Sequence, residues 1–310
     1  MKVIQAKSAG FCYGVQRAVE LAEQTARERG GCVMLGSIIH NAHVVQHLEQ
    51  LGAHQVAGPE AIRPGDTVLI RAHGEKKQVI GHLKDIGAEC VDATCPNVLR
   101  VQQIVAQADA EGRVPIIIGD PNHPEVMGVA SWSARSVVFE GAETLQRWLD
   151  EDPARRELPL TAVAQTTCIR IIWDGAAEIL KKQCTNAKIF DTICNATHKR
   201  QSEAAELASQ VDVMVVVGDR KSANTKHLTE ICSRQCPAVY QIERAEELKR
   251  DFLTGCSVAG LTAGASTPAG IIKEVYTTMS EEIKTMEPTE ESFEEMLEKS
   301  FKTLNTGEKV

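Results

Sequence analysis

The stretch DATCP at residues 92–96 places a cysteine where a β-branched run gives way to helical spacing of apolar residues. GFCYG at residues 10–14 and DTICN at residues 191–195 repeat this arrangement. The three cysteines lie 83 and 99 residues apart, which is the length of a small domain and too long for a solenoid repeat. The spacing predicts three units of similar size, each beginning just after one of these cysteines.

Each of these cysteines, Cys12, Cys95 and Cys194, is expected at the N-terminus of a helix. There, unpaired backbone N–H groups and the positive end of the helix dipole favour the thiolate. Three converging thiolates form a soft, anionic site that suits an iron–sulfur cluster. Because the protein offers three ligands, one iron of a four-iron cluster would stay open for substrate.

Short β-branched runs alternate with amphipathic stretches along almost the whole chain. We predict strands at residues 32–39, 67–72, 114–119, 160–165, 211–218 and 256–261, and helices at residues 13–29, 77–86, 96–111, 175–183, 197–210 and 268–285. Such alternation is typical of an α/β fold with mainly parallel sheets.

We therefore expect three small α/β domains in a pseudo-threefold arrangement around a central iron–sulfur cluster, at residues 13–95, 96–193 and 194–280. Residues 1–12 are left over as a strand that pairs with the third domain and brings all three cysteines to one centre. Residues 281–310 form an acidic C-terminal tail.

The composition is that of an ordinary globular protein of 310 residues, with 43% hydrophobic and 25% charged residues. A net charge of −8 disfavours non-specific wrapping of a polyanion but permits a small anionic ligand in a local pocket. No apolar run approaches a membrane span and the first residues read as a strand, so we expect a cytoplasmic protein. Its ten cysteines are then thiols or metal ligands rather than disulfides.

Polar residues cluster after the predicted strands, where α/β folds bind their ligands. These residues are His40 with Asn41, His73, His123 with Glu125, Thr166 with Thr167, Ser222 with Ala223 and Asn224, and Ser266. Three histidines, several hydroxyl groups and an asparagine make a donor set suited to a diphosphate. Glu125 is the acid of the set and a natural proton donor, unless it only orients the neighbouring His123.

Taken singly, each of these features has an ordinary structural explanation. A strand-end histidine is usually a satisfied hydrogen-bonding residue, a Ser-Thr-Pro run is usually a helix cap, and a lone cysteine is usually a small buried hydrophobe. Their accumulation at equivalent places in the chain favours a functional site. The other seven cysteines are assigned to packing, including the CxxxC pair Cys232 and Cys236, which is a weak metal signal.

Eight motifs occur in order between residue 8 and about residue 270: GFCYGV (10–15), IIHN (38–41), RAHG (71–74), DATCP (92–96), HPEV (123–126), QTT (165–167), TICNAT (192–197) and TAGASTP (262–268). In these motifs the chain resembles the 4-hydroxy-3-methylbut-2-enyl diphosphate reductase family. The resemblance covers nearly the whole chain, and eight motifs together are highly specific.

The resemblance implies a role for each residue of the set. Cys12, Cys95 and Cys194 would hold a [4Fe–4S] cluster with one open iron. The substrate diphosphate would be bound by His40, His73, His123, Ser222, Asn224 and Ser266, with Thr167 and Ala223 beside them. Thr166 would position the reacting hydroxyl, and Glu125 would deliver protons next to His123.

The implied reaction is the reductive dehydroxylation of (E)-4-hydroxy-3-methylbut-2-enyl diphosphate to isopentenyl and dimethylallyl diphosphate, the last step of the non-mevalonate isoprenoid pathway. The chain has no GxGxxG dinucleotide motif, so the electrons must come from outside, from a ferredoxin or flavodoxin.

Two other functions stay open at this point. A cluster-containing hydratase or dehydratase would turn over without reductant. A redox-sensing regulator would bind nucleic acid, which the acidic composition and the lack of a basic recognition helix argue against.

The sequence departs from the family pattern in two places, and its tail resembles something else. Ala223 stands where the family often has a second serine, and residues 168–172 (CIRII) differ from the shorter, more polar form expected there. In the tail, residues 281–299 hold eight acidic and two basic side chains. The stretches ESFEEML (291–297) and TGEKV (306–310) resemble the lead-in to an S1-type RNA-binding domain, the alternative being an ordinary frayed end. We expect no membrane partner, and no nucleic-acid partner unless such a domain follows.

Overall fold

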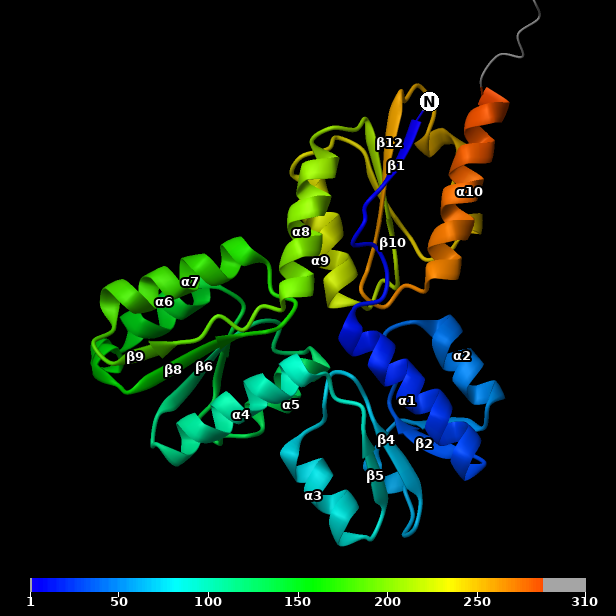
Figure 1. Cartoon of the computed structure of the whole chain (residues 1–310). Helices are drawn as coiled ribbons and strands as arrows, with labels where there is room; N and C mark the ends of the chain where they lie inside the picture. The colour runs from blue at the N-terminus through cyan, green and yellow to red at the C-terminus, as the bar shows by residue number, and fades with distance from the viewer. Residues whose placement is uncertain (1, 287–310) are drawn as a thin grey trace, which may run out of the picture.

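The computed structural model describes residues 2–286 of the chain. Figure 1 shows three lobes around a common centre, and each lobe contains one four-stranded sheet with helices beside it. All strand pairs in the three sheets are parallel. The predicted α/β class with three parallel-sheet units is confirmed.

The first unit has the strand order β3-β2-β4-β5. Its elements are α1 (Tyr13–Arg29), β2 (Cys32–Leu35), α2 (Ala42–Gln50), β3 (Ala53–Val56), the 3₁₀ turn η1 (Pro59–Ala61), β4 (Thr67–Ile70), α3 (Lys77–Asp85) and β5 (Glu89–Asp92). One core joins α1 and α2 to the sheet, and a second core lies on the side of Leu83 in α3. Both faces of the sheet are therefore covered.

The second unit repeats this plan with the strand order β7-β6-β8-β9. Its elements are α4 (Pro96–Ala110), β6 (Val114–Ile118), α5 (Pro124–Ala130), β7 (Val137–Phe139), α6 (Ala142–Glu151), η2 (Pro153–Glu157), β8 (Leu160–Ala164), α7 (Arg170–Gln183) and β9 (Ala187–Ile189). Helices α6 and α7 contribute to one core and helices α4 and α5 to the other.

The third unit contains both early and late parts of the described chain, with the strand order β1-β12-β10-β11. Its elements are β1 (Lys2–Gln5), α8 (Asn195–Ala208), β10 (Val213–Val217), α9 (Ala223–Ser233), β11 (Val239–Ile242), η3 (Ala245–Glu247), η4 (Arg250–Phe252), β12 (Val258–Ala263) and α10 (Ala269–Met286). Strand β1 pairs with β12 in a register that places Lys2 opposite Val258 and Gln5 opposite Leu261.

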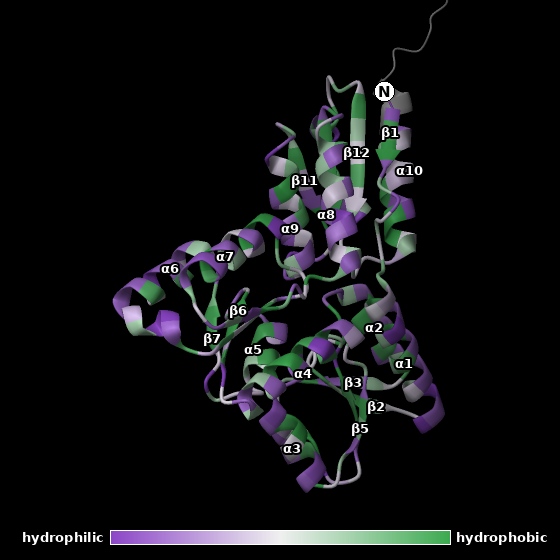
Figure 2. Cartoon of the chain, turned by 60° about the vertical axis from the view of Figure 1, so that its left-hand side comes forward, coloured by the Kyte–Doolittle hydropathy of each residue, from purple (hydrophilic) through white to green (hydrophobic). Residues whose placement is uncertain are grey.

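The continuous apolar run of β10 shows why these sheets are covered on both sides. Val213, Val215 and Val217 face the core that contains α10, whereas Met214 and Val216 face the core that contains α8 and α9. A strand buried on both faces lacks polar alternation. Figure 2 shows the same pattern, with hydrophobic strands inside and helices that are hydrophilic on part of their surface.

The order of strands is equivalent in the three units, and this equivalence builds the centre. One edge strand of each sheet precedes a cysteine: β5 precedes Cys95, β9 precedes Cys194 and β1 precedes Cys12. Each of these edge strands pairs with the central strand that comes later in the chain, namely β4, β8 or β12. The two central strands precede the polar residues described below. One repeated topology thus brings the carboxyl ends of nine strands toward a common site.

Several sequence predictions lie beyond these observations. The S1-like stretches at residues 291–297 and 306–310 fall outside the described residues. The domain boundaries proposed at residues 12, 95 and 193 stay a prediction. No helix within residues 2–286 combines the length and the apolar character needed to cross a bilayer.

Candidate active site and three-cysteine centre

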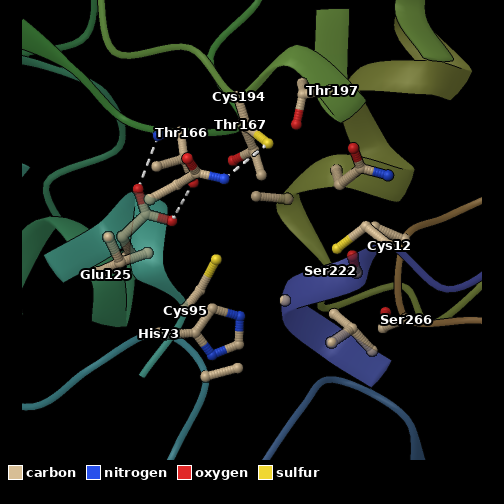
Figure 3. A pocket seen from close by; sticks show the side chains of 18 of the residues that line it. Cys12, His73, Cys95, Glu125, Thr166, Thr167, Cys194, Thr197, Ser222 and Ser266 are labelled. Carbon is tan, nitrogen blue, oxygen red and sulfur yellow. Dashed lines mark hydrogen bonds between the residues drawn. The ribbon is translucent and has the colours of Figure 1, made fainter. Parts of the chain in front are cut away.

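Each of the three cysteines stands at the N-cap of a helix. Cys12 precedes α1, Cys95 precedes α4 and Cys194 precedes α8. Their sulfur atoms point from three sides into one space in Figure 3, and all three side chains line the same cavity. The helix N-termini therefore direct unpaired N–H groups toward the sulfur atoms.

The surroundings of these thiols fit an iron–sulfur cluster. All ten cysteines of the chain are free. A Cβ atom on Gly14 would lie 2.4 Å from the Cys95 Sγ, so glycine at this position keeps space beside the sulfur. The Asn97 side-chain amide donates to the Cys194 Sγ over 3.2 Å, the kind of hydrogen bond that tunes a cluster ligand. Three soft sulfur donors, one at each junction between two units, fit such a cluster with three protein ligands.

Three histidines from two units line the same cavity as the cysteines. The ring centroids of His40 and His73 lie 4.6 Å apart, and that of His123 lies 5.9 and 5.3 Å from them. Burial is the main cause that lowers the pKa of each imidazole, and it lowers the pKa of His123 to about 4. The proximity of the other two rings lowers the pKa of His73 further. The three rings are therefore neutral in the free site at pH 7.

The histidines do not fit the ordinary explanation of satisfied strand-end residues. His40 Nε2 and His73 Nδ1 are buried without a hydrogen-bond partner. The third unit adds further buried polar atoms without partners, on Asn224 and Ser266. Leaving such atoms unpaired is costly, and a bound polyanion would pair with them.

Glu125 and Thr166 form a hydrogen-bonded pair. The Thr166 backbone N–H donates to Glu125 Oε1 over 2.7 Å, and the Thr166 hydroxyl donates to Oε2 over 2.8 Å (Figure 3). The Glu125 side chain is 2% exposed, and burial raises the pKa of its carboxyl group although the bonds from Thr166 oppose this.

The structure also bears on the alternative role of Glu125. The Glu125 backbone N–H donates to His123 Nδ1 over 3.2 Å, so the His123 side chain caps α5. The Glu125 carboxylate takes no part in this contact. Among the described residues the carboxylate bonds to Thr166 alone. It therefore does not orient the histidine through its side chain.

One cavity brings together all the residues that the sequence predicted for the site except Asn41, whose side chain caps α2. Its space amounts to about 710 Å³, including the part open to solvent. The predicted residues that line it are Cys12, His40, His73, Cys95, His123, Glu125, Thr166, Thr167, Cys194, Ser222, Ala223, Asn224 and Ser266. Ser222 also caps α9 by accepting from the Thr225 backbone N–H, as a helix-capping serine does.

Besides Asn97, which donates to the Cys194 sulfur, sequence reasoning missed Arg200 and His227. Arg200 lines the cavity from α8 and is 3% exposed. His227 Nδ1 lies 2.6 Å from the carbonyl oxygen of Thr167 and fixes that strand end. The signal for Arg200 is its place on the buried face of α8 beside Thr197, Gln201 and Ala204, where an arginine needs a specific reason.

The remaining cysteines are consistent with packing. Cys232 and Cys236 are buried, and their thiols lie near backbone carbonyls of Ala204 and Val211. Burial raises the pKa of Cys168 and of Cys232 to about 12. Neither of these two thiols lines the cavity that contains Cys12, Cys95 and Cys194.

Three parallel-sheet units that bring three thiols, a histidine trio and a buried acid to one cavity define the class of this protein, an α/β oxidoreductase. The model of the family described as LytB protein matches residues 3–280. The chain belongs to the LytB protein family.

Two curated relatives of this chain carry the same name. The chain is 39% identical over 297 residues to the 4-hydroxy-3-methylbut-2-enyl diphosphate reductase of Caldanaerobacter subterraneus subsp. tengcongensis, which covers 94% of this chain and 100% of the relative. It is 38% identical over 276 residues to the protein of that name from Nitratiruptor sp., covering 89% of this chain and 97% of the relative.

Solved structures agree with the fold. A structure of (E)-4-hydroxy-3-methyl-but-2-enyl diphosphate reductase, the terminal enzyme of the non-mevalonate pathway, matches with a TM-score of 0.65 and 37% identity, over 91% of this chain and all of that chain. The E-1-hydroxy-2-methyl-but-2-enyl-4-diphosphate reductase from Plasmodium falciparum matches with a TM-score of 0.85 and 26% identity, over 90% and 88% of the two chains.

Proposed function

We propose that this chain reduces (E)-4-hydroxy-3-methylbut-2-enyl diphosphate to isopentenyl and dimethylallyl diphosphate, with a [4Fe–4S] cluster held by Cys12, Cys95 and Cys194. The observation that carries the proposal is one cavity in which three thiols face buried polar atoms without partners. A diphosphate supplies the acceptors that these atoms lack, and the names of the relatives support the substrate.

In this reaction the C–O bond to the hydroxyl breaks, a C–H bond forms, and two electrons and two protons are consumed as water leaves. When bound, the cluster supplies electrons one at a time and an open iron as a Lewis acid. The protein residues bind and orient the substrate. His40, His73, His123, Ser222, Asn224 and Ser266, with Thr167 and the backbone at Ala223, hold the diphosphate in this proposal.

Glu125 delivers the proton to the leaving hydroxyl group. Its raised pKa favours the carboxylic acid, because burial disfavours the charged form. In the acid form the Glu125 Oε2–H would donate to the Thr166 hydroxyl oxygen, 2.8 Å away, which reverses the hydrogen bond of the ionised form and frees the Thr166 proton for the substrate hydroxyl that Thr166 positions. A short relay from Glu125 through Thr166 thus places a proton where the C–O bond breaks.

The test of this function is turnover with and without reductant. Anaerobically purified protein should convert the substrate to both products when dithionite and methyl viologen are present, and should not convert it without them. Conversion without reductant would favour a hydratase or dehydratase instead, and no conversion in either case would contradict the proposal.

We also propose that a ferredoxin or flavodoxin supplies the electrons through a second hollow beside the cysteines. This hollow is lined by Cys12, Cys95 and Cys194 together with Tyr13, Asn97, Arg100, Arg170 and Asp191. Tyr13 is 74% exposed. Arg170 is paired with Asp191 over 2.6 Å, so the exposed Arg100 supplies the positive charge of this hollow that favours an acidic carrier. Such a carrier and the free thiols fit a reducing, cytoplasmic location.

This electron path predicts a selective effect of charge at the rim. Arg100→Glu should slow turnover with reduced flavodoxin and leave turnover with dithionite unchanged, because a rim charge mainly changes the rate of encounter. Arg147→Glu on α6, an exposed position outside the hollow, is the matched control and should change neither rate. If wild type and Arg100→Glu turn over at the same rate with reduced flavodoxin, the carrier does not dock at this hollow.

The neutral histidines predict that the site takes up protons when it binds a diphosphate. The anion favours the imidazolium form and raises the histidine pKa values from their lowered positions. The complex then holds more protons than the free protein and the free diphosphate together. The affinity for the diphosphate therefore rises as the pH falls through the raised histidine pKa values. Calorimetry of inorganic pyrophosphate in two buffers of different ionisation enthalpy measures this uptake. His40→Gln removes a ring whose Nε2 atom has no partner in the free site, so it should take up fewer protons than wild type, and equal uptake by both proteins would contradict the prediction.

A further inference from the structure

Arg200 is a buried cation that ties the N-terminal segment to helix α8. Its Nε atom donates to the carbonyl oxygen of Ser8 over 2.9 Å, and its Nη2 atom donates to that of Gly10 over 2.7 Å. These partners lie 192 and 190 residues away in the sequence. Because α8 begins after Cys194, the guanidinium links the helix of one cysteine to the loop that leads into another, Cys12.

A second residue of α8 completes this clamp. Glu203 accepts the backbone N–H groups of Lys7 and Ser8 over 2.7 and 2.8 Å. The clamped loop passes close to α10 at Gly10, where φ is 103° and a Cβ atom would lie 3.0 Å from the Ile272 side chain, so glycine suits this position. The position of Cys12 is therefore set by α8 as well as by its own helix.

The Arg200 guanidinium forms no salt bridge with a described residue. Among the described residues its hydrogen bonds go to carbonyl oxygens, and its Nη1 atom is buried without a partner. Burial lowers the pKa of this guanidinium, whereas the neighbouring Cys12, Cys194 and Glu203 raise it. An arginine stays protonated in such a place, so its positive charge lies near two of the three sulfur atoms as well as near the Glu203 carboxylate.

We propose that Arg200 is a positioning residue that fixes Cys12 relative to Cys194 and raises the reduction potential of the cluster that the two thiols hold. The proposal rests on the cluster of the proposed function. Reduction adds a negative charge, and a nearby buried cation stabilises the reduced form. The positioning effect depends on the two hydrogen bonds from Arg200 to the carbonyl groups of Ser8 and Gly10, whereas the electrostatic effect depends on the charge of the side chain. Two variants, one that removes the charge and one that keeps it, therefore separate the two effects.

The experiment compares Arg200→Met and Arg200→Lys in the full chain after anaerobic cluster reconstitution. The midpoint potential is followed by electron paramagnetic resonance, and cluster retention by iron loss to a chelator. Arg200→Met should lower the midpoint potential and weaken retention by about 10- to 100-fold, as expected when an outer residue of a metal site is lost. Arg200→Lys should keep the potential near that of wild type but weaken retention, because an ammonium lacks the planar fork that spans both carbonyl groups.

The matched control is Arg113→Lys. Arg113 is also buried, bonded to Thr161 and Asn186 in the second unit, and it does not line the cavity. The Arg113→Lys variant should leave both the midpoint potential and the retention of the cluster unchanged. A wild-type potential in Arg200→Met would overturn the electrostatic part, and wild-type retention in both Arg200 variants would overturn the positioning part. Failure of the proposed function itself looks different, because wild-type protein would then form no cluster.

Discussion

Cys95→Ser protein purified without oxygen is expected to contain almost no iron and to convert no substrate. A serine hydroxyl is a hard, weakly acidic donor and a poor replacement for a soft thiolate. Cys12→Ser and Cys194→Ser should behave in the same way, because each supplies the ligand at one junction between two units. Iron analysis per chain and the absorption spectrum of the reconstituted protein measure the effect.

Cys232→Ser is the control for a cysteine substitution in itself. Its side chain is fully buried in α9, packed away from the cavity, and its replacement should leave the iron content near that of wild type. Full iron content in any of the three cavity variants, or its loss in the Cys232 variant, would show that the ligands have been misassigned.

Glu125→Gln is expected to bind both the cluster and the substrate yet to turn over more slowly by a factor of about 10² to 10⁴. Glutamine keeps the shape of the side chain and can still accept the Thr166 N–H, but it has no acid proton to deliver. Steady-state rates with dithionite and methyl viologen measure the chemical step without a protein carrier.

Thr166→Val extends this test along the relay. It removes the hydroxyl that lies 2.8 Å from Glu125 and should also slow turnover while the cluster stays bound. Near-normal turnover of Glu125→Gln would remove Glu125 from the mechanism. A slow rate accompanied by lost iron would instead assign Glu125 a structural role.

The strongly patterned elements could be predicted from the sequence. Helix α1 begins and ends where the apolar spacing predicts, at Tyr13 and Arg29. Helix α7 begins five residues earlier than expected, at Arg170, because Gly175 lies inside it against Ala142. The strands β3, β7 and β11 were not among the predicted strands, since three or four residues with partly exposed side chains give little periodicity.

The candidate site could be predicted as far as its residues follow strands. Parallel sheets place the carboxyl ends of their strands at one edge, so histidines, hydroxyl groups and cysteines after those strands were found from position alone. Arg200 could not be found in this way. It lies within a helix, and its partners Ser8 and Gly10 are contacts between distant segments that only the assembled fold brings together.

The most direct test of the account is a Mössbauer spectrum of anaerobically purified, iron-57-enriched protein, recorded with and without substrate. With three cysteine ligands, we predict a [4Fe–4S] spectrum in which one iron differs from the other three and changes when the substrate binds. A spectrum of four equivalent irons that ignores the substrate, or the absence of any four-iron cluster, would contradict the claim that the three cysteines hold the catalytic centre of this reductase.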